Sequence, residues 1–182
     1  MLSQLTEAMI VNGAVLAAVL ATDLGPARKI GPARVLRPVI LAVVIPLFID
    51  RPVLHGTGLA VEAAGVVAGL LGGLAALALM RVYRHPATSR PVSAAGAPYA
   101  ALWVVVIGAR AAFSYGSAHW FTASLVSWAV ANQVAEAAIV DGLIFMAIVM
   151  VLVRTAGLAV RAARLPLPSS HGEQAGDIAA VR

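Results

Sequence analysis

The chain has 182 residues, of which 61 % are hydrophobic and 12 % charged, with a net charge of +5 and no cysteine. Soluble domains carry about a quarter charged residues, so this composition excludes an ordinary water-soluble fold. The lack of cysteine excludes disulfides, thiolate catalysis, iron–sulfur clusters and cysteine-bound zinc.

Charged residues fall in short clusters that separate long apolar stretches. No formal charge occurs over residues 63–80, 91–109, 111–135 or 142–153. A helix needs about 20 apolar residues to cross the hydrocarbon core of a bilayer. The pattern therefore predicts an all-α, polytopic transmembrane helical bundle of about five spans. The predicted spans cover residues 5–22, 35–49, 57–80, 91–113 and 132–153.

The first two predicted spans are joined by a basic connector. The first span ends before Asp23 and Gly25, and residues 23–37 then contain two copies of a Gly-Pro-Ala-Arg sequence. The second span is short, and we expect Pro46 to kink or end it, because proline removes a backbone donor. A basic loop over 81–90 follows the third span, and an interfacial turn over 114–120 follows the fourth.

Residues 121–153 are too many for one upright span and too few for two spans with a loop. We favour an interfacial or partly inserted helix over 121–130 that leads into a final span over 132–153. The sequence leaves open whether 121–135 spans, lies on or re-enters the membrane. A transmembrane domain over 1–165 is expected, followed by a polar, disordered tail over 166–182.

The sign of the charge clusters predicts the orientation. Lysine and arginine concentrate in residues 23–37, 81–90 and 154–164. Positive connectors prefer the cytoplasm, so five spans place the N-terminus outside and the C-terminus inside. The abundance of alanine and arginine suggests a bacterial source, and hence the inner membrane. We expect the basic connectors to meet anionic lipids rather than nucleic acid.

Four charged residues interrupt or closely adjoin the apolar stretches, and they are Arg110, Asp141, Glu136 and Glu62. A charge deep in a span costs at least about 2.5–3.5 kcal/mol on insertion scales, so it usually pairs or serves a function. Arg110 either pairs with Asp141 or reaches the outer headgroups. Glu62 is accounted for by the positive end of its helix, and the alternative is an externally facing cation site.

The third span contains glycines at every fourth position, Gly65, Gly69 and Gly73. Small residues at this spacing lie on one helix face and let a second helix approach closely. We expect this face to pack within the protomer, with dimerisation as the alternative.

Catalytic motifs are absent, so no catalytic residue and no cofactor is predicted. The serines lack a nucleophile-elbow setting, and the chain has no phosphate-binding loop and no His-Glu-x-x-His sequence. His55 and His119 fall in the two predicted outward loops and are the residues considered for a haem or metal site. Neither belongs to a short ligand motif.

Three local sequences resemble the CcdC-like bacterial membrane proteins, a family of unknown function. They are Arg34-Val-Leu-Arg37-Pro38, Met80-Arg81-Val82-Tyr83, and Tyr99-Ala-Ala-Leu102-Trp103 with Arg110 seven residues on. The resemblance covers about residues 34–115. The family name implies an association with cytochrome c maturation but no activity, and no functional residue is carried over.

Two hypotheses of function follow. The first is a non-enzymatic accessory or assembly protein that acts through helix–helix contacts, either as a homo-oligomer or with a membrane protein partner. The second is a small oligomeric transporter or channel with Arg110, Asp141 and Glu62 along its path. A water-filled cavity beside these charges favours transport, whereas a dry bundle favours the accessory role.

Overall fold

The computed structural model describes residues 4–31, 36, 40 and 56–166. This part of the chain is mostly helical. Its helices are α1 (Gln4–Asp23), α3 (Gly56–Ala78), α4 (Ala97–His119), α5 (Thr122–Ala131) and α6 (Glu136–Ala163). By length and apolar composition, three of them could cross a membrane, namely α3, α4 and α6. The chain is therefore a membrane protein by the character of its helices.

The helix bounds differ from the predicted spans in the second half of the chain. Helices α1 and α3 lie where spans over 5–22 and 57–80 were predicted, but α4 begins at Ala97 and α6 continues to Ala163. Between them α5 forms the short helix expected over 121–130. The span predicted over 35–49 and the tail over 166–182 lie outside the described residues, except for single positions.

A small sheet corrects the all-α prediction. Strands β1 (Gly25–Lys29), β2 (Met80–Arg84) and β3 (Pro91–Ala95) form an antiparallel sheet in the order β1-β3-β2. Residues 91–95 were predicted to be helical, as the start of the fourth span. Pro91 is the first residue of its strand, where a missing backbone donor is tolerated. The sheet therefore lies where α1 and α3 end and where α4 begins.

The strand signal in β2 is an alternation of five residues. Met80 is buried and Val82 half-buried, whereas Arg81 and Tyr83 are exposed. The turn to β3 closes where the His85 amide donates to the Arg90 carbonyl at 2.9 Å, with Ser89 in the left-handed region at φ 51°. The alternation in β2 covers only five residues and follows directly after the long apolar sequence of α3, so the sequence alone did not predict this strand.

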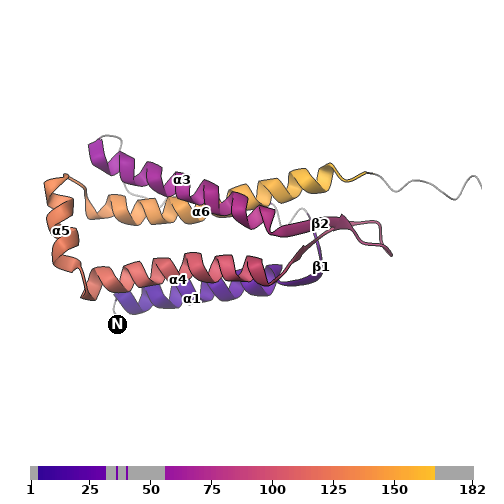
Figure 1. Cartoon of the computed structure of the whole chain (residues 1–182), viewed down its shortest axis with the longest axis horizontal. Coiled ribbons are helices and arrows are strands. Elements are labelled where there is room, and N and C mark those ends of the chain that lie inside the picture. Colours follow the sequence, from indigo (N-terminus) through magenta and orange to yellow (C-terminus); the bar gives the residue numbers. More distant parts are fainter. Residues whose placement is uncertain (1–3, 32–35, 37–39, 41–55, 167–182) are drawn as a thin grey trace, which may run out of the picture.

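The helices form two pairs that lie along one another, α1 with α4 and α3 with α6 (Figure 1). Contact between α3 and α4 is slight. The two pairs are joined at one end by the sheet and at the other by α5, which runs across the bundle (Figure 1). Helices α1, α3 and α6 all run toward the sheet, whereas α4 leaves it.

The glycine face of α3 lies against α6. A β-carbon at Gly65 or Gly69 would come closer than 3.0 Å to the Gly142 or Met146 carbonyl, and one at Gly73 would lie 2.8 Å from the Met150 carbonyl. The contacts advance four residues at a time on both helices, so the helices are parallel and their four-residue ridges mesh. Only glycine, whose side chain is a single hydrogen atom, allows the backbones of α3 and α6 to approach this closely.

The hydrophobic core lies toward the sheet end. It is built from Ala76, Leu77, Met80, Ala95, Tyr99, Trp103, Ile107, Met150 and Leu158. Large apolar side chains elsewhere on α3, α4 and α6 are exposed, among them Leu71 and Val105. Such exposure suits a lipid-facing surface and not a soluble domain.

Several basic side chains of the predicted cytoplasmic clusters cap helix ends. Arg161 donates to the Leu77 carbonyl at 2.8 Å, and Arg28 donates to the Ala21 carbonyl at 3.1 Å. Carbonyls in the last turn of a helix lack partners within that helix, and cations are favoured there. The clusters therefore satisfy backbone groups at the sheet end.

Candidate functional site

A buried cluster of Asp23, Tyr99 and Arg154 joins the two helix pairs at the sheet end. Asp23 is the last residue of α1, Tyr99 lies in the first turn of α4, and Arg154 is on α6. The Tyr99 hydroxyl donates to Asp23 Oδ2 at 2.5 Å, and the Arg154 guanidinium donates to the Tyr99 oxygen at 2.7 Å. Arg154 also forms an ion pair with Asp23. We call this the Asp23–Tyr99–Arg154 cluster.

Because all three side chains are buried, each one depends on the others for its polar contacts. Asp23 is 1 % exposed, Tyr99 0 % and Arg154 8 %. An isolated charge in such surroundings is costly, and an acid at a helix C-terminus faces the negative end of the helix dipole. The arginine and the phenol offset both effects for Asp23. Each member of the cluster thus makes the burial of another one tolerable.

The wall of the cluster carries further polar groups. The Trp103 ring lies 6.3 Å from the Tyr99 ring, centroid to centroid. Within the part of the chain that the structure describes, the Trp103 Nε1 and Arg154 Nε donors are buried without an acceptor. The cluster therefore retains unused hydrogen-bond donors next to an ion pair.

For Arg110 the sequence left two alternatives open, an ion pair with Asp141 and a position at the outer headgroups. Among the described residues no ion pair joins the two side chains. Asp141 is 8 % exposed on α6 and Glu62 is 5 % exposed on α3, so both acids are buried in the α3–α6 pair. Arg110 is half-buried on α4, and Glu136 is exposed at the start of α6.

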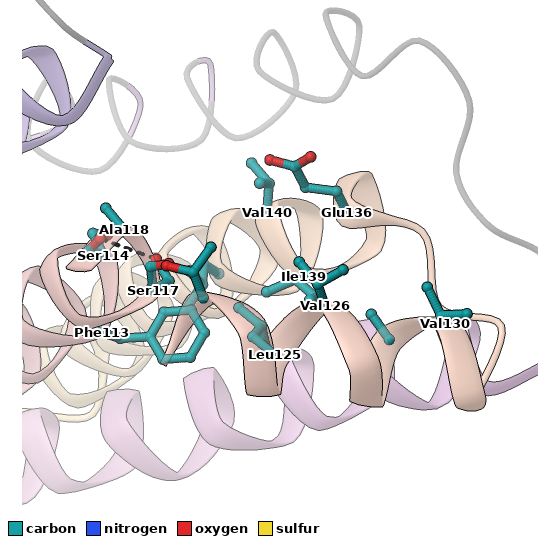
Figure 2. Close-up of a pocket in the computed structure, with 13 residues that line it drawn as sticks. Phe113, Ser114, Ser117, Ala118, Leu125, Val126, Val130, Glu136, Ile139 and Val140 are labelled. Atoms are coloured by element: carbon teal, nitrogen blue, oxygen red, sulfur yellow. Dashed lines mark hydrogen bonds between the residues drawn. The ribbon is translucent and has the colours of Figure 1, made fainter. Parts of the chain in front are cut away.

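Two adjoining cavities run along α4 and α6, with volumes of about 570 and 400 Å³. Phe113 and Leu143 line both, so we treat them as one feature, the α4–α6 groove. Its wider part opens beside α5, where Ser114 and Ser117 face Val140 and Glu136 across the space (Figure 2). Arg110 lines the narrower part, whose other walls are Ala68, Gly72, Val105, Val106, Ala109, Phe113, Leu143, Met146 and Met150.

Two hydroxyl groups of the wider part donate hydrogen bonds to nearby backbone carbonyls. The Ser117 hydroxyl donates to the Ser114 carbonyl at 3.0 Å, and the Thr122 hydroxyl donates to the Ser117 carbonyl at 2.6 Å. Their oxygens remain acceptors. Most of the wall is aliphatic, so the groove suits an apolar molecule with a small polar part.

The histidines do not come together with other ligands among the described residues. His119 stacks on the Tyr115 ring with centroids 4.4 Å apart, and its Nδ1 lies 3.1 Å from the Tyr115 carbonyl. His55 lies outside the described residues. The described part of the chain holds no group of three or more histidine, aspartate or glutamate side chains placed to bind a metal ion.

Sequence reasoning missed the Asp23–Tyr99–Arg154 cluster. Asp23 was interpreted as the polar end of the first span and Arg154 as part of a topology signal. One local signal was present, because an acid at the C-terminal end of a helix is disfavoured unless a cation compensates. Its partner on α6 is 131 residues away, beyond any local pattern.

Comparison with known proteins yields no relative. No family model matches the chain, and no curated protein and no solved structure matches it. The resemblance to CcdC-like proteins stays a prediction from the three short motifs.

Proposed function

We propose that the chain is a multi-pass protein of the bacterial inner membrane that binds a small solute in the α4–α6 groove and carries it across, without catalysing a reaction. The observation that carries this proposal is the pairing of the helices. Each pair packs along its own length, the sheet joins the pairs at one end and α5 connects them at the other, and a groove lined by Arg110 lies between α4 and α6. Carriers commonly work by rocking two such units about a site near the bilayer midplane.

The placement of charges supports the membrane orientation we propose. The described residues of the three basic clusters lie at one end of the molecule, in strand β1, in and beside the turn between β2 and β3, and along the last turns of α6 (Figure 1). Positive segments prefer the cytoplasm, so we place the sheet inside and α5 outside. Because α1 and α3 run in the same direction, a five-span chain requires a crossing between them, and we propose that the segment over 35–49, which lies mostly outside the described residues, makes it.

Helix α5 suits the outer interface rather than a crossing. It has only ten residues, none of them buried. Trp128 within the helix is 44 % exposed, and Trp120 just before it is 75 % exposed. Ten residues span about 15 Å, half of the hydrocarbon thickness, and tryptophan favours the headgroup level.

Brominated lipids can measure this depth, since bromine quenches nearby tryptophan fluorescence. In a variant that keeps Trp128 alone, we expect stronger quenching by lipids brominated near the headgroup than near the bilayer centre. A variant that keeps Trp103 alone serves as the control, because this side chain is 4 % exposed and should be quenched weakly by both lipids. Stronger quenching of Trp128 by the deep bromines would contradict the interfacial placement.

The accessory hypothesis depended on a glycine face of α3 that is open to a partner helix. The glycine face of α3 is covered by α6, so a partner helix has no access to it. The transport hypothesis gains the groove beside Arg110, although Glu62 and Asp141 lie in the α3–α6 pair instead of lining the groove. We therefore keep Arg110 as the charged residue of the path and assign the two acids to packing.

Spin labels can test whether the helix pairs move against each other. The chain has no cysteine, so introduced thiols are the only labelling sites. Ala118→Cys with Val140→Cys places labels on α4 and α6 across the groove, and Val66→Cys with Val140→Cys places them within the α3–α6 pair. We expect pulsed EPR in lipid nanodiscs to give a broad or two-component distance distribution across the groove and one narrow distribution within the pair.

A single narrow distribution for both label pairs would contradict the carrier proposal. A rigid groove would return support to an accessory role.

A further inference from the structure

We propose that the narrower part of the α4–α6 groove is a binding site for a small amphipathic monoanion, with Arg110 holding the anionic head and the apolar walls holding a hydrocarbon tail. This inference rests on the proposed function, since it names the class of solute carried. Among the described residues, Arg110 is the one charged side chain that lines this part of the groove.

Arg110 has the properties of an anion anchor. It is half-buried near the middle of α4, and among the described residues no acid forms an ion pair with it. An unpaired guanidinium in an apolar setting is costly, and a carboxylate, sulfonate or phosphate oxygen is the partner that its donors match. Apart from Arg110 the described wall is apolar, so one negative charge is what the site can neutralise.

Space beside Arg110 comes from small residues. Ala68 and Gly72 on α3 and Ala109 on α4 line the cavity where larger side chains would fill it. The cavity of about 400 Å³ continues past Phe113 and Leu143 into the wider part. A tail can therefore extend from the arginine toward α5 along aliphatic walls (Figure 2).

Depth favours a free amphiphile over a membrane phospholipid. Arg110 lies nine residues before the end of α4, which places it about 14 Å from the α5 end of the bundle. A phospholipid headgroup stays at the interface, whereas a short-chain anion can enter the groove and reach this depth. Glu136 lines the wider part, and a carboxylate there repels a head with two negative charges about twice as strongly as it repels a monoanion.

Octanoate, with octanol as the uncharged analogue, tests the site. The thermal unfolding midpoint of the protein in phosphatidylcholine nanodiscs should rise with octanoate and saturate, because a ligand that binds the native state stabilises it. Arg110→Gln should weaken the apparent affinity for octanoate on the order of tenfold, the effect of losing a charged hydrogen bond, and leave the response to octanol unchanged. Arg110→Lys should restore part of it.

Two further variants distinguish the effect of the Arg110 charge from the effect of the cavity volume. Ala68→Leu keeps the arginine and fills the cavity, so we expect it to weaken the binding of both octanoate and octanol. Arg90→Gln removes an exposed arginine of the β2–β3 turn and should bind octanoate as the wild type does. Ala68→Leu also keeps the proposal testable if Arg110→Gln fails to fold.

The inference is overturned if the octanoate effect survives both Arg110→Gln and Ala68→Leu. It is also overturned if octanoate has no effect and an Arg110-dependent stabilisation appears only with phosphatidylglycerol nanodiscs, since the ligand is then a lipid headgroup. Failure of the proposed function is recognised separately, because the spin-label distances report movement of the helix pairs without any ligand.

Discussion

Replacing Arg154 with glutamine should destabilise the protein by about 3–5 kcal/mol, because it removes the positive charge that Arg154 places against the buried Asp23 carboxylate. Asp23 is 1 % exposed and lies at the negative end of α1, so solvent cannot replace the lost partner. The hydrogen bond from Tyr99 compensates only part of the charge that Arg154 neutralises. We expect the loss in a denaturant titration of the purified protein in mixed micelles.

The double variant Asp23→Asn with Arg154→Gln identifies the cause. Both side chains are then neutral amides that can still bond to each other and to Tyr99, so much of the lost stability should return. Arg164→Gln is the matched control, since this arginine is exposed at the end of the same helix and should change stability by less than about 0.5 kcal/mol. A double variant no more stable than Arg154→Gln would argue against charge compensation.

A leucine at Gly69 should separate α3 from α6. A β-carbon at this position already meets the Met146 carbonyl closer than 3.0 Å, and the contacting atom is backbone that cannot move aside as a side chain can. Overpacking costs about 1–3 kcal/mol even where side chains can adjust, so we expect at least the upper part of this range. The same denaturant titration measures it.

Gly108→Ala is the control for this experiment. Gly108 is inside α4, and a β-carbon there meets no atom within 4 Å in the described part of the chain. We expect this change to be neutral or to stabilise by up to about 1 kcal/mol, because alanine is the better helix former. If Gly69→Leu left monomer stability unchanged and altered only the oligomeric state, the glycine face would serve a dimer instead.

The cluster and the glycine face have different roles in one architecture. The glycines allow α3 and α6 to pack as a unit, and the Asp23–Tyr99–Arg154 cluster ties this unit to α1 and α4 beside the sheet. With the sheet end held, we expect the relative movement of the two units to be largest at the α5 end. The wider part of the α4–α6 groove lies at that end.

The sequence by itself determined which segments are apolar helices and where charges are scarce. The predictions for α1, α3 and α5 depended on apolar length and glycine spacing, which are local properties of the backbone and of its hydration. The sheet was missed because its strands are only five residues long, and because β1 pairs with a strand that is distant in the chain.

Only the tertiary structure decided which side chains meet. The glycine spacing indicated a close helix contact but could not name α6 as the partner, and it remained open from the sequence whether Arg110 pairs with Asp141, an ion pair that is absent among the described residues. Arg154 instead pairs with Asp23, because the parallel course of α1 and α6 brings their sheet ends together and a buried acid requires the nearest cation. Ion pairing depends on distance in space, which no local pattern of residues records.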